Sequence, residues 1–396
     1  MMRIAADWLA DPGVRAVMAL FAPAGHRAWF VGGCVRNAVI GAGATDVDIA
    51  TDALPERVLA LAGAAGLRAV PTGIAHGTVT LVAGGRPHEV TTLRRDVETR
   101  GRHATVAFGT SLEGDAARRD FTMNALYASA AGEVLDPLGQ GLADLRAGRV
   151  RFIGDAGARI AEDYLRILRF FRFHAWYGDP GGGIDPEGLA ACAGGLEGLA
   201  ALSRERVGAE MRKLLAAPDP APAVGAMAAA GVLLRVLPGA GVRTLAVLVH
   251  VEDAAGLAPD WLRRLAALGG EDAAARLRLS RAEARRLARL REGMAQDRSA
   301  AETGYRLGIA DGTGVLALRA AMAGRALAPA ALASLRDGAA RVFPLRAADL
   351  PPGLAGPAIG AALARLEAQW IAEDFVPGRA ALLARLDPQG GSAPRR

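Results

Sequence analysis

The chain changes its pattern of apolar and polar residues near residue 155. Before that point, short apolar runs are separated by glycine-bearing turns, which is typical of strands and short helices. Beyond it, apolar residues recur at helical spacing between glycine and proline breaks. The pattern therefore predicts the α+β class, with the strands confined to the first part of the chain. The predicted strands span residues 29–31, 46–49, 68–70, 77–82, 88–92 and 150–153.

Other segments are predicted from periodicity and from helix start signals. Amphipathic patterns predict helices over residues 3–22 and over residues 161–173. Ser280 and Glu283 form a capping box, which predicts the start of a basic helix. Residues 94–103 are rich in charge, contain a glycine and show no period, and this predicts an exposed, mobile loop.

A glycine pair and two aspartates follow the first strand closely. Gly32 and Gly33 allow a tight turn and close approach of a ligand, and the helix predicted after them would direct its free N–H groups toward a phosphate. Asp46 and Asp48 are two residues apart, so on a strand they share a face, roughly 7 Å apart. Such a pair can share two divalent cations about 3.5–4 Å apart. The same residues alone also fit a solvated strand edge and an ordinary turn.

Two further groups of charged residues are candidates for the same site. Glu89 lies on a predicted strand of β-branched residues and is a candidate third carboxylate, although a glutamate on a solvated strand face fits equally well. Arg118 and Arg119 precede an alternating apolar segment, where guanidinium groups could neutralise phosphate charge. The alternative is a solvated pair of charges before a strand.

The predicted helix over residues 161–173 carries arginines in an otherwise apolar sequence. Arg166, Arg169 and Arg172 recur every third residue, so we expect them to line a partly buried polar pocket, each with a partner. Asp163 lies three residues before Arg166, a spacing at which the two side chains can orient each other.

Composition narrows the classes of protein. The chain has 396 residues, a length that suggests two or three domains. Of these residues, 52% are hydrophobic and 5% are aromatic. A net charge of +6 fits an anionic partner, although Lys213 is the only lysine and a coding bias toward arginine explains the charge as well. Cys34 and Cys192 are the only cysteines, so a disulfide framework and a cysteine-based zinc site are excluded. No signal peptide or membrane span is apparent, which predicts a cytoplasmic protein without membrane contact.

Five motifs follow one another along the chain. They are Gly32-Gly33-Cys34-Val35-Arg36, Asp46-Val47-Asp48, Glu89-Val90-Thr91-Thr92-Leu93-Arg94, Arg118-Arg119-Asp120-Phe121-Thr122-Met123-Asn124-Ala125 and Glu162-Asp163-x-x-Arg166. In these motifs, over roughly residues 25–215, the sequence resembles the bacterial class II tRNA nucleotidyltransferases (CCA-adding enzymes) and the related bacterial poly(A) polymerases. It departs from them at Asn37, where an aspartate is usual, and at Arg100, which interrupts a loop that often carries an acid.

The resemblance implies a domain organisation. It implies a small mixed-sheet head of the polymerase-beta-like nucleotidyltransferase type over residues 1–154, which would carry the catalytic, metal and triphosphate sites. A helical neck for nucleotide selection would follow over 155–232, and a helical body and tail for RNA binding over 233–389. Composition predicts that residues 390–396 are disordered.

The resemblance also assigns roles to individual residues. It implies that Asp46 and Asp48 are catalytic and bind Mg²⁺, with Glu89 as a further catalytic acid. The nucleotide-binding residues that it implies are Gly32, Gly33, Arg36, Arg119, Asp120, Asp163, Arg166, Arg169 and Arg172.

Base chemistry independently supports selection by the predicted helix. Cytosine and adenine both present an exocyclic amine beside a ring-nitrogen acceptor, so a carboxylate such as Asp163 can accept from the amine while Arg166 donates to the ring. Uracil and guanine present the reverse order and would leave buried groups unpaired, which can discriminate by about 10⁴-fold. One protein template could therefore accept CTP and ATP and refuse UTP and GTP.

The expected function is template-independent addition of CCA to the 3′ end of tRNA by two-metal nucleotidyl transfer, with release of pyrophosphate. Its expected partners are tRNA or another RNA 3′ end, CTP and ATP. A poly(A) polymerase shares all five motifs, and an enzyme that adds only CC or only A is also compatible. A non-catalytic RNA-binding protein is disfavoured by the intact pair Asp46 and Asp48. An HD-type phosphohydrolase is disfavoured because none of the six histidines precedes an aspartate.

Overall fold

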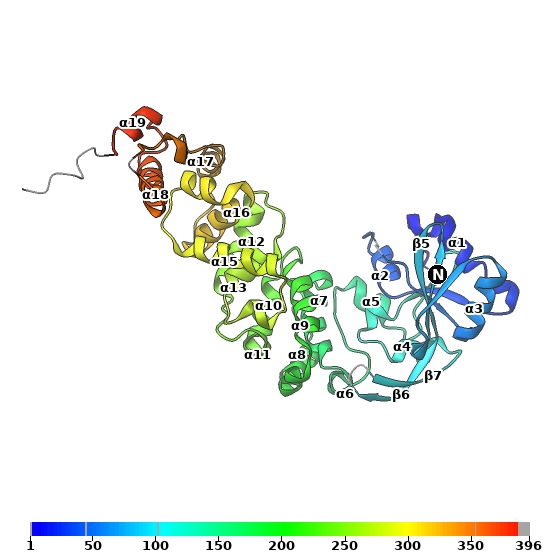
Figure 1. Ribbon diagram of the computed structural model, residues 1–396. Coiled ribbons are helices and arrows are strands. Elements are labelled where there is room, and N and C mark those ends of the chain that lie inside the picture. The colour runs from blue at the N-terminus through cyan, green and yellow to red at the C-terminus, as the bar shows by residue number, and fades with distance from the viewer. Residues whose placement is uncertain (1, 44–45, 101–102, 353, 387–396) are drawn as a thin grey trace, which may run out of the picture. The chain divides into compact units, whose positions relative to one another are not determined.

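A computed structural model describes residues 2–43, 46–100, 103–352 and 354–386 (Figure 1). The chain divides into two compact units. The first unit comprises Met1–Val242 and Gly269–Leu279, and the second comprises Arg243–Leu268 and Ser280–Arg396. The predicted disordered segment 390–396 lies outside the described residues, and the predicted four-part domain division stays a prediction. No helix in the described ranges is long and apolar enough to cross a membrane.

The first unit is built on a seven-stranded sheet in the order β3-β4-β5-β2-β1-β8-β9. β2 and β5 run parallel, whereas the other neighbouring strands are antiparallel, so the sheet is mixed and the predicted α+β class is confirmed. The strands are β1 (Ala28–Val31), β2 (Ile49–Thr51), β3 (Arg68–Gly73), β4 (Thr78–Ala83), β5 (Arg86–Thr92), β8 (Tyr127–Ala128) and β9 (Val134–Leu135).

Helices cover this sheet and continue the unit beyond it. Alternate residues of β4 are buried, and α1 and α3 pack against this strand. Farther along the chain, α7 packs against α9 and α10. The helices of this unit are α1 (Pro12–Met18), α2 (Gly33–Val39), α3 (Pro55–Ala64), α4 (Leu112–Ala117), α5 (Gly141–Arg146), α6 (Ala156–Glu162), α7 (Leu165–Tyr177), α8 (Pro186–Gly194), α9 (Arg204–Leu215), α10 (Ala221–Ala229), α11 (Val232–Val236) and α14 (Ala273–Arg276).

Two predicted segments are wrong in their secondary structure. The charged segment predicted as a loop forms a two-stranded hairpin of β6 (Arg94–Arg100) and β7 (His103–Phe108). The two strands pair with each other and so satisfy the hydrogen bonds of their backbone groups. The many charged residues of this segment had hidden its tendency to form strands. The strand predicted over 150–153 is reduced to a single bridge between Phe152 and Phe121.

Three predicted elements begin or end differently. The helix predicted over residues 3–22 is interrupted where Asp11 accepts hydrogen bonds from two backbone N–H groups and caps α1. The helix predicted over 161–173 is broken at Asp163, whose backbone is extended and whose side chain accepts from the Leu165 N–H. Asp46 and Asp48 precede β2 rather than lying within it.

The second unit is helical in its described residues. The predicted capping box at the start of α15 is confirmed. α16 and α17 pack very closely: a Cβ on Gly304 would meet the Leu335 carbonyl oxygen at 2.0 Å, and one on Gly338 would meet the Ala301 carbonyl oxygen at 1.9 Å. The helices are α12 (Arg243–Ala254), α13 (Trp261–Leu268), α15 (Arg281–Ala295), α16 (Ala300–Met322), α17 (Pro329–Ala339), α18 (Pro357–Ala372) and α19 (Arg379–Leu383).

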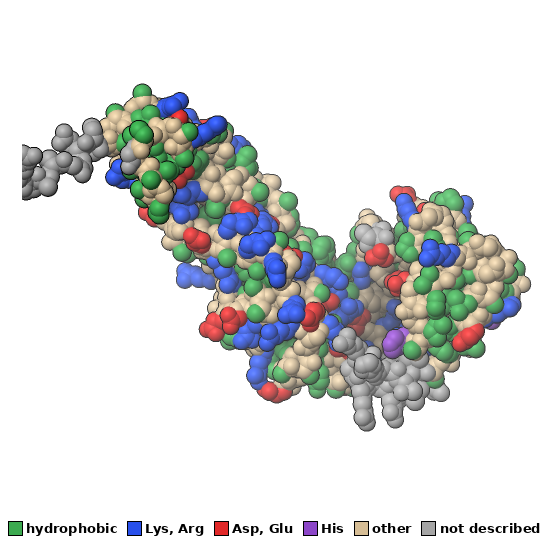
Figure 2. Space-filling model, in the orientation of Figure 1, with side chains coloured by type: hydrophobic (Ala, Val, Ile, Leu, Met, Phe, Trp, Pro, Cys, Tyr) green, Lys and Arg blue, Asp and Glu red, His purple; other side chains and the backbone are tan. Residues whose placement is uncertain are grey.

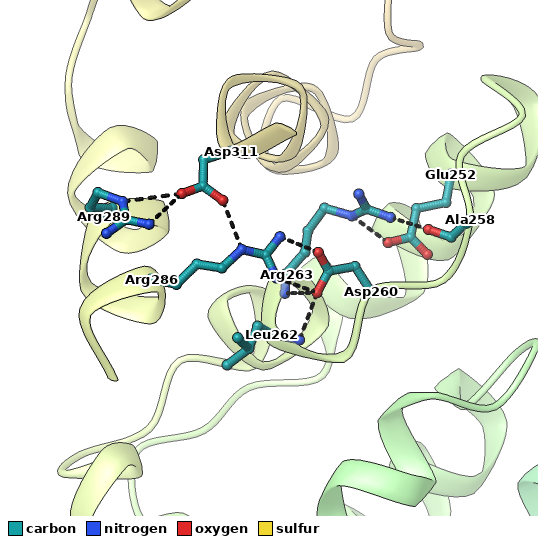
Figure 3. Close-up of polar contacts among 8 residues, drawn as sticks. All are labelled: Glu252, Ala258, Asp260, Leu262, Arg263, Arg286, Arg289 and Asp311. Carbon is teal, nitrogen blue, oxygen red and sulfur yellow. Dashed lines mark hydrogen bonds and ion pairs between the residues drawn. The ribbon is translucent and has the colours of Figure 1, made fainter. Parts of the chain in front are cut away.

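Buried ion pairs join the helices of this unit (Figure 3). Glu252 of α12 accepts from Arg263 at 2.6 Å and from Arg264 at 2.8 Å, and all three side chains are buried. In the same region, Arg286 of α15 bridges Asp260 and Asp311. Because one carboxylate neutralises two buried guanidinium groups, Glu252 holds α12 and α13 together.

We expect Glu252→Ala to lower the free energy of unfolding of this unit by about 3–5 kcal/mol, because two guanidinium groups would stay buried without their anion. Asp253→Ala is the matched control, since Asp253 is exposed on the same helix, and we expect a change within about 0.5 kcal/mol. Urea denaturation followed by circular dichroism measures both variants. A loss below about 1 kcal/mol for Glu252→Ala would contradict this account of the ion pairs.

Candidate functional site

The turn between β1 and α2 requires glycine and is flanked by two arginines. Gly32 has φ +73°, a conformation that L side chains rarely adopt, and its N–H donates to the Leu126 carbonyl oxygen at 3.0 Å. A Cβ on Gly32 would lie 3.3 Å from Arg119 Nη1, and one on Gly33 would lie 3.7 Å from Arg36 Nη2. The backbone of the turn thus lies between two guanidinium groups.

Parallel pairing of β2 with β5 brings two of the predicted carboxylates together. Ile49 is in register with Val90, so the residues before them, Asp48 and Glu89, are neighbours across the strands. Both are exposed, and with Asp46 they line a cavity of about 1020 Å³. Although Asp48 is exposed at the cavity, the surrounding protein partly desolvates its carboxylate, and this desolvation together with the charges of Glu89 and Asp46 raises the pKa of Asp48, against the opposing effect of Arg119. The site therefore concentrates negative charge at Asp48.

The remaining wall of the cavity comes from the N-terminal segment, the end of α2 and the start of β5. None of its described lining residues belongs to α7. Within the described ranges, no group of three or more His, Cys, Asp or Glu side chains is arranged to hold a metal ion. The lining residues are Ala5, Ala6, Asp7, Trp8, Ala10, Asp11, Val14, Ala38, Gly41, Ala42, Gly43, Asp46, Val47, Asp48, Thr80, Arg86, Pro87, His88 and Glu89.

Arg119 is fixed from behind by a buried acid. Asp115 of α4 accepts from Arg119 Nη2 at 3.0 Å and from the Tyr127 hydroxyl at 2.6 Å, and it also pairs with Arg118. Burial alone would raise the pKa of Asp115, but Arg119, Arg118 and Tyr127 together lower it to about 2. Asp115 is therefore a carboxylate at neutral pH, and it orients Arg119 beside Gly32.

Arg36 is buried, and among the described residues no carboxylate pairs with it. Its side chain donates to Asn124 Oδ1 at 2.5 Å, to Tyr177 Oη at 2.7 Å and to Asn37 Oδ1 at 2.9 Å, all neutral oxygens. Burial lowers the pKa of the Arg36 guanidinium. Asn37 thus supplies a hydrogen bond in place of the salt bridge that an aspartate there would form, and its amide donates to the Gly43 carbonyl oxygen.

The prediction that each arginine of α7 has a partner is confirmed. Arg166 pairs with Glu162, Arg169 with Asp120 at 2.5 Å, and Arg172 with Glu210 at 2.5 Å. Asp120 is buried, and its second oxygen accepts from the Asn124 amide at 2.9 Å. These pairs tie α7 to the sheet-bearing part of the unit on one side and to α9 on the other.

The prediction that Asp163 and Arg166 orient each other through their side chains is wrong. Asp163 lies at the break between α6 and α7, where its Oδ2 accepts from Arg206 Nη2 at 2.6 Å. Arg166 instead donates to the carboxylate of Glu162 and to the Arg118 carbonyl oxygen. Each residue is thus fixed independently by a partner that the other does not share.

Sequence analysis missed several residues that position the predicted ones. Asn124 and Asp115 lie within or just before the arginine motif, which was a usable signal. Arg206 and Glu210, the two partners supplied by α9, are four residues apart and carry opposite charges on an amphipathic helix. This spacing was a weaker signal than the arginine motif. The missed residues are Asp115, Asn124, Tyr127, Tyr177, Arg206 and Glu210.

Two family models match parts of the chain, and several CCA-adding enzymes are similar to it in sequence. Residues 28–151 match the poly A polymerase head domain, and residues 183–241 match a probable RNA and SrmB-binding site of polymerase A. Over 204 residues the chain is 43% identical to the mouse mitochondrial CCA tRNA nucleotidyltransferase 1, which covers 51% of this chain and 47% of the relative. Over 245 residues it is 38% identical to the CCA-adding enzyme of Geobacillus thermodenitrificans, covering 61% and 55%. The chain thus spans about half the length of these relatives.

Solved structures extend the similarity along the chain. The crystal structure of the Bacillus stearothermophilus CCA-adding enzyme in complex with CTP matches with a TM-score of 0.72 at 28% identity, over 95% of this chain and 98% of that one. The Thermotoga maritima CCA-adding enzyme complexed with tRNA shares the fold, with a TM-score of 0.67 at 18% identity. The chain thus carries a match to the poly A polymerase head domain over residues 28–151, and both its sequence and its fold are similar to those of CCA-adding enzymes.

Proposed function

We propose that this protein adds CCA to the 3′ end of tRNA from CTP and ATP, without a nucleic-acid template and with release of pyrophosphate. The observation that carries the proposal is the placement of Asp48 beside Glu89 on the parallel strands β2 and β5, with Arg119, which adjoins Gly32, near enough to act on the Asp48 carboxylate. Carboxylates for a metal and guanidinium groups for phosphates are the two requirements of nucleotidyl transfer.

The family is generally metal-dependent, and we propose Mg²⁺ for this chain. The donor set fits, because carboxylate oxygens suit Mg²⁺ and the raised pKa of Asp48 marks negative charge that a divalent cation would neutralise. Asp46 and Asp48 would hold the metal, with Glu89 as a further acid. Bound there, the metal would activate the RNA 3′-hydroxyl and stabilise the leaving oxygens.

The triphosphate is proposed to lie at the glycine turn. The first turn of α2, which no side chain caps in the described residues, and the guanidinium groups of Arg36 and Arg119 all adjoin Gly32 and Gly33. Asp115 and Tyr127 hold Arg119, so this arginine reaches the phosphates already oriented.

Base selection is proposed for the start of α7. A carboxylate has more acceptor positions than Arg206 and the Leu165 N–H occupy, so Asp163 can still accept from the exocyclic amine of cytosine or adenine. Arg166, oriented by Glu162, would donate to the ring nitrogen. Arg169 and Arg172 would support this edge-reading surface through their own ion pairs.

The helical part of the chain is proposed to hold the RNA. The predicted roles of the domains and the cytoplasmic location are likewise proposals. Basic side chains are spread over the helical surface seen in Figure 2. Arg281, Arg285 and Arg289 are exposed on α15 at intervals of four residues, so they share a face that can contact phosphates.

Incubation of the protein with tRNA that lacks its CCA end, Mg²⁺ and single labelled nucleoside triphosphates tests the function. We expect CMP incorporation from CTP, then one AMP after two CMP, and negligible use of UTP or GTP. ATP-only tailing of unrelated RNA would instead establish a poly(A) polymerase. Incorporation confined to CC or to a final A would establish a partial CCA-adding enzyme. RNA binding without any incorporation would refute catalysis.

Removing one proposed metal ligand tests the acidic site. We expect Asp48→Asn to lower kcat at least about 10³-fold, because the metal contribution amounts to several kcal/mol, while tRNA affinity changes little. Glu56→Gln is the control, since Glu56 is exposed on α3 and does not line the cavity. Steady-state incorporation and filter binding of tRNA measure the two effects. Retained turnover in Asp48→Asn would refute the metal assignment.

Altering the carboxylate at the helix break tests base selection. We expect Asp163→Asn to reduce the preference for CTP over UTP by roughly 10–100-fold, because one acceptor oxygen becomes an NH₂ donor that can serve the carbonyl oxygen of uracil. Arg206→Met should produce a smaller change in the same direction, since it releases Asp163 from its partner. The ratios of kcat/KM for CTP and UTP give the result, with Glu187→Gln on α8 as an exposed control. An unchanged ratio in Asp163→Asn would remove Asp163 from the selecting site.

A further inference from the structure

Tyr177, the last residue of α7, makes two contacts with the proposed triphosphate-binding Arg36. The guanidinium carbon of Arg36 lies 4.0 Å from the centroid of the Tyr177 ring, and Arg36 Nη2 donates to the Tyr177 hydroxyl at 2.7 Å. A cation over an aromatic face and a hydrogen bond to a charged group both favour one orientation of the guanidinium. Tyr177 therefore fixes Arg36 from the side of the selecting helix.

The contact closes a loop of interactions that begins and ends on α7. From Arg36 it continues through Asn124 to Asp120, and Asp120 pairs with Arg169. Arg169 and Tyr177 are eight residues apart, so they lie along one side of the helix.

Phe173 fills the space between the two ends of this loop. Its ring centroid lies 5.2 Å from the guanidinium carbon of Arg36 and 5.3 Å from that of Arg169, and it packs against the Tyr177 ring at 5.5 Å. Phe173 is itself buried. The aromatic pair thus contacts both the arginine of the glycine turn and an arginine of the selecting helix.

The charge of Arg36 makes this arrangement sensitive to Tyr177. In the described part of the chain Arg36 forms no ion pair with a carboxylate, and Arg172 adds a repulsive charge nearby, opposed by Asp120. The C-terminal end of α7, where Tyr177 lies, is the end of a helix that favours a cation. The guanidinium therefore depends on neutral partners for its position until an anionic ligand is bound.

We propose that Tyr177 is a positioning residue that holds Arg36 in the orientation needed to bind the nucleotide triphosphate. This inference rests on the proposed function and adds a determinant outside the five motifs. Since the triphosphate is common to all substrates, the loss of Tyr177 acts on the affinity for every nucleotide by the same factor. It leaves the choice of base, which Asp163 and Arg166 make, unchanged.

The test compares three variants of the full-length protein in the CCA-addition assay. Tyr177→Phe removes only the hydroxyl, and we expect KM for CTP and for ATP to rise about 3–10-fold with kcat nearly unchanged. Tyr177→Leu also removes the aromatic face, and we expect a rise of about 10–100-fold. Trp176→Phe is the matched control: Trp176 is exposed and donates to the Lys213 carbonyl oxygen, so we expect KM to stay at the wild-type value.

A double-mutant cycle separates positioning of Arg36 from a general structural role. In an Arg36→Lys background, Tyr177→Phe should add less than about a twofold change in KM. Wild-type KM values in Tyr177→Phe and Tyr177→Leu, with or without a lower melting temperature, would overturn the proposal, as would equal effects of Tyr177→Phe in both backgrounds. Failure of the proposed function is distinct, because it would appear in the wild-type protein itself, which would then incorporate no nucleotide, only CMP or only AMP.

Discussion

Guanidinium groups withdrawn from water need fixed partners, and this constraint governs the proposed site. Around α7, each arginine is matched by a partner from another element or the preceding helix: Arg166 by Glu162, Arg169 by Asp120 and Arg172 by Glu210. Burial of a charge without such a partner would cost several kcal/mol. The pairs therefore fix both the side chains and the packing of α7 between the sheet-bearing part of the unit and α9.

Sheet topology imposes the complementary arrangement of negative charge. Only the parallel contact of β2 with β5 places Asp48 beside Glu89, two residues that are far apart in the sequence. Desolvation and the like charges of Glu89 and Asp46 raise the pKa of Asp48, and the positive charge of Arg119 opposes this rise. The cost of bringing the carboxylates together would thus be offset by a divalent cation bound at the proposed site.

Local sequence predicted the parts of the site that depend on adjacent residues. The glycine turn, the spacing of Asp46 and Asp48 and the arginines of α7 can be read from short motifs. The hairpin of β6 and β7 was missed because its charges outweighed the signal of its β-branched residues. The break at Asp163 was missed because it depends on a side-chain hydrogen bond to the Leu165 N–H, which helical periodicity does not report.

Contacts between distant segments were beyond sequence reasoning for a different reason. Arg36 and Tyr177 are separated by 141 positions, and no local pattern links them. Their meeting depends on how α7 packs against the sheet-bearing part of the unit, which is itself fixed by the pair of Arg169 with Asp120.

The side chains of α9 that contact α6 and α7 would make the proposed base recognition a property of two packed helices rather than of one motif. Arg206 and Glu210 are one turn apart, and each binds a residue proposed to read or support the base edge, Asp163 and Arg172. A shift of α9 along α7 would therefore move the acceptor and a supporting arginine together. A protein that uses its own side chains as a template needs them held this rigidly, because a displacement of about 1 Å would weaken discrimination between hydrogen-bond patterns. If α7 selects the nucleotide as proposed, its packing on α9 would determine that choice as much as the residues that touch the base.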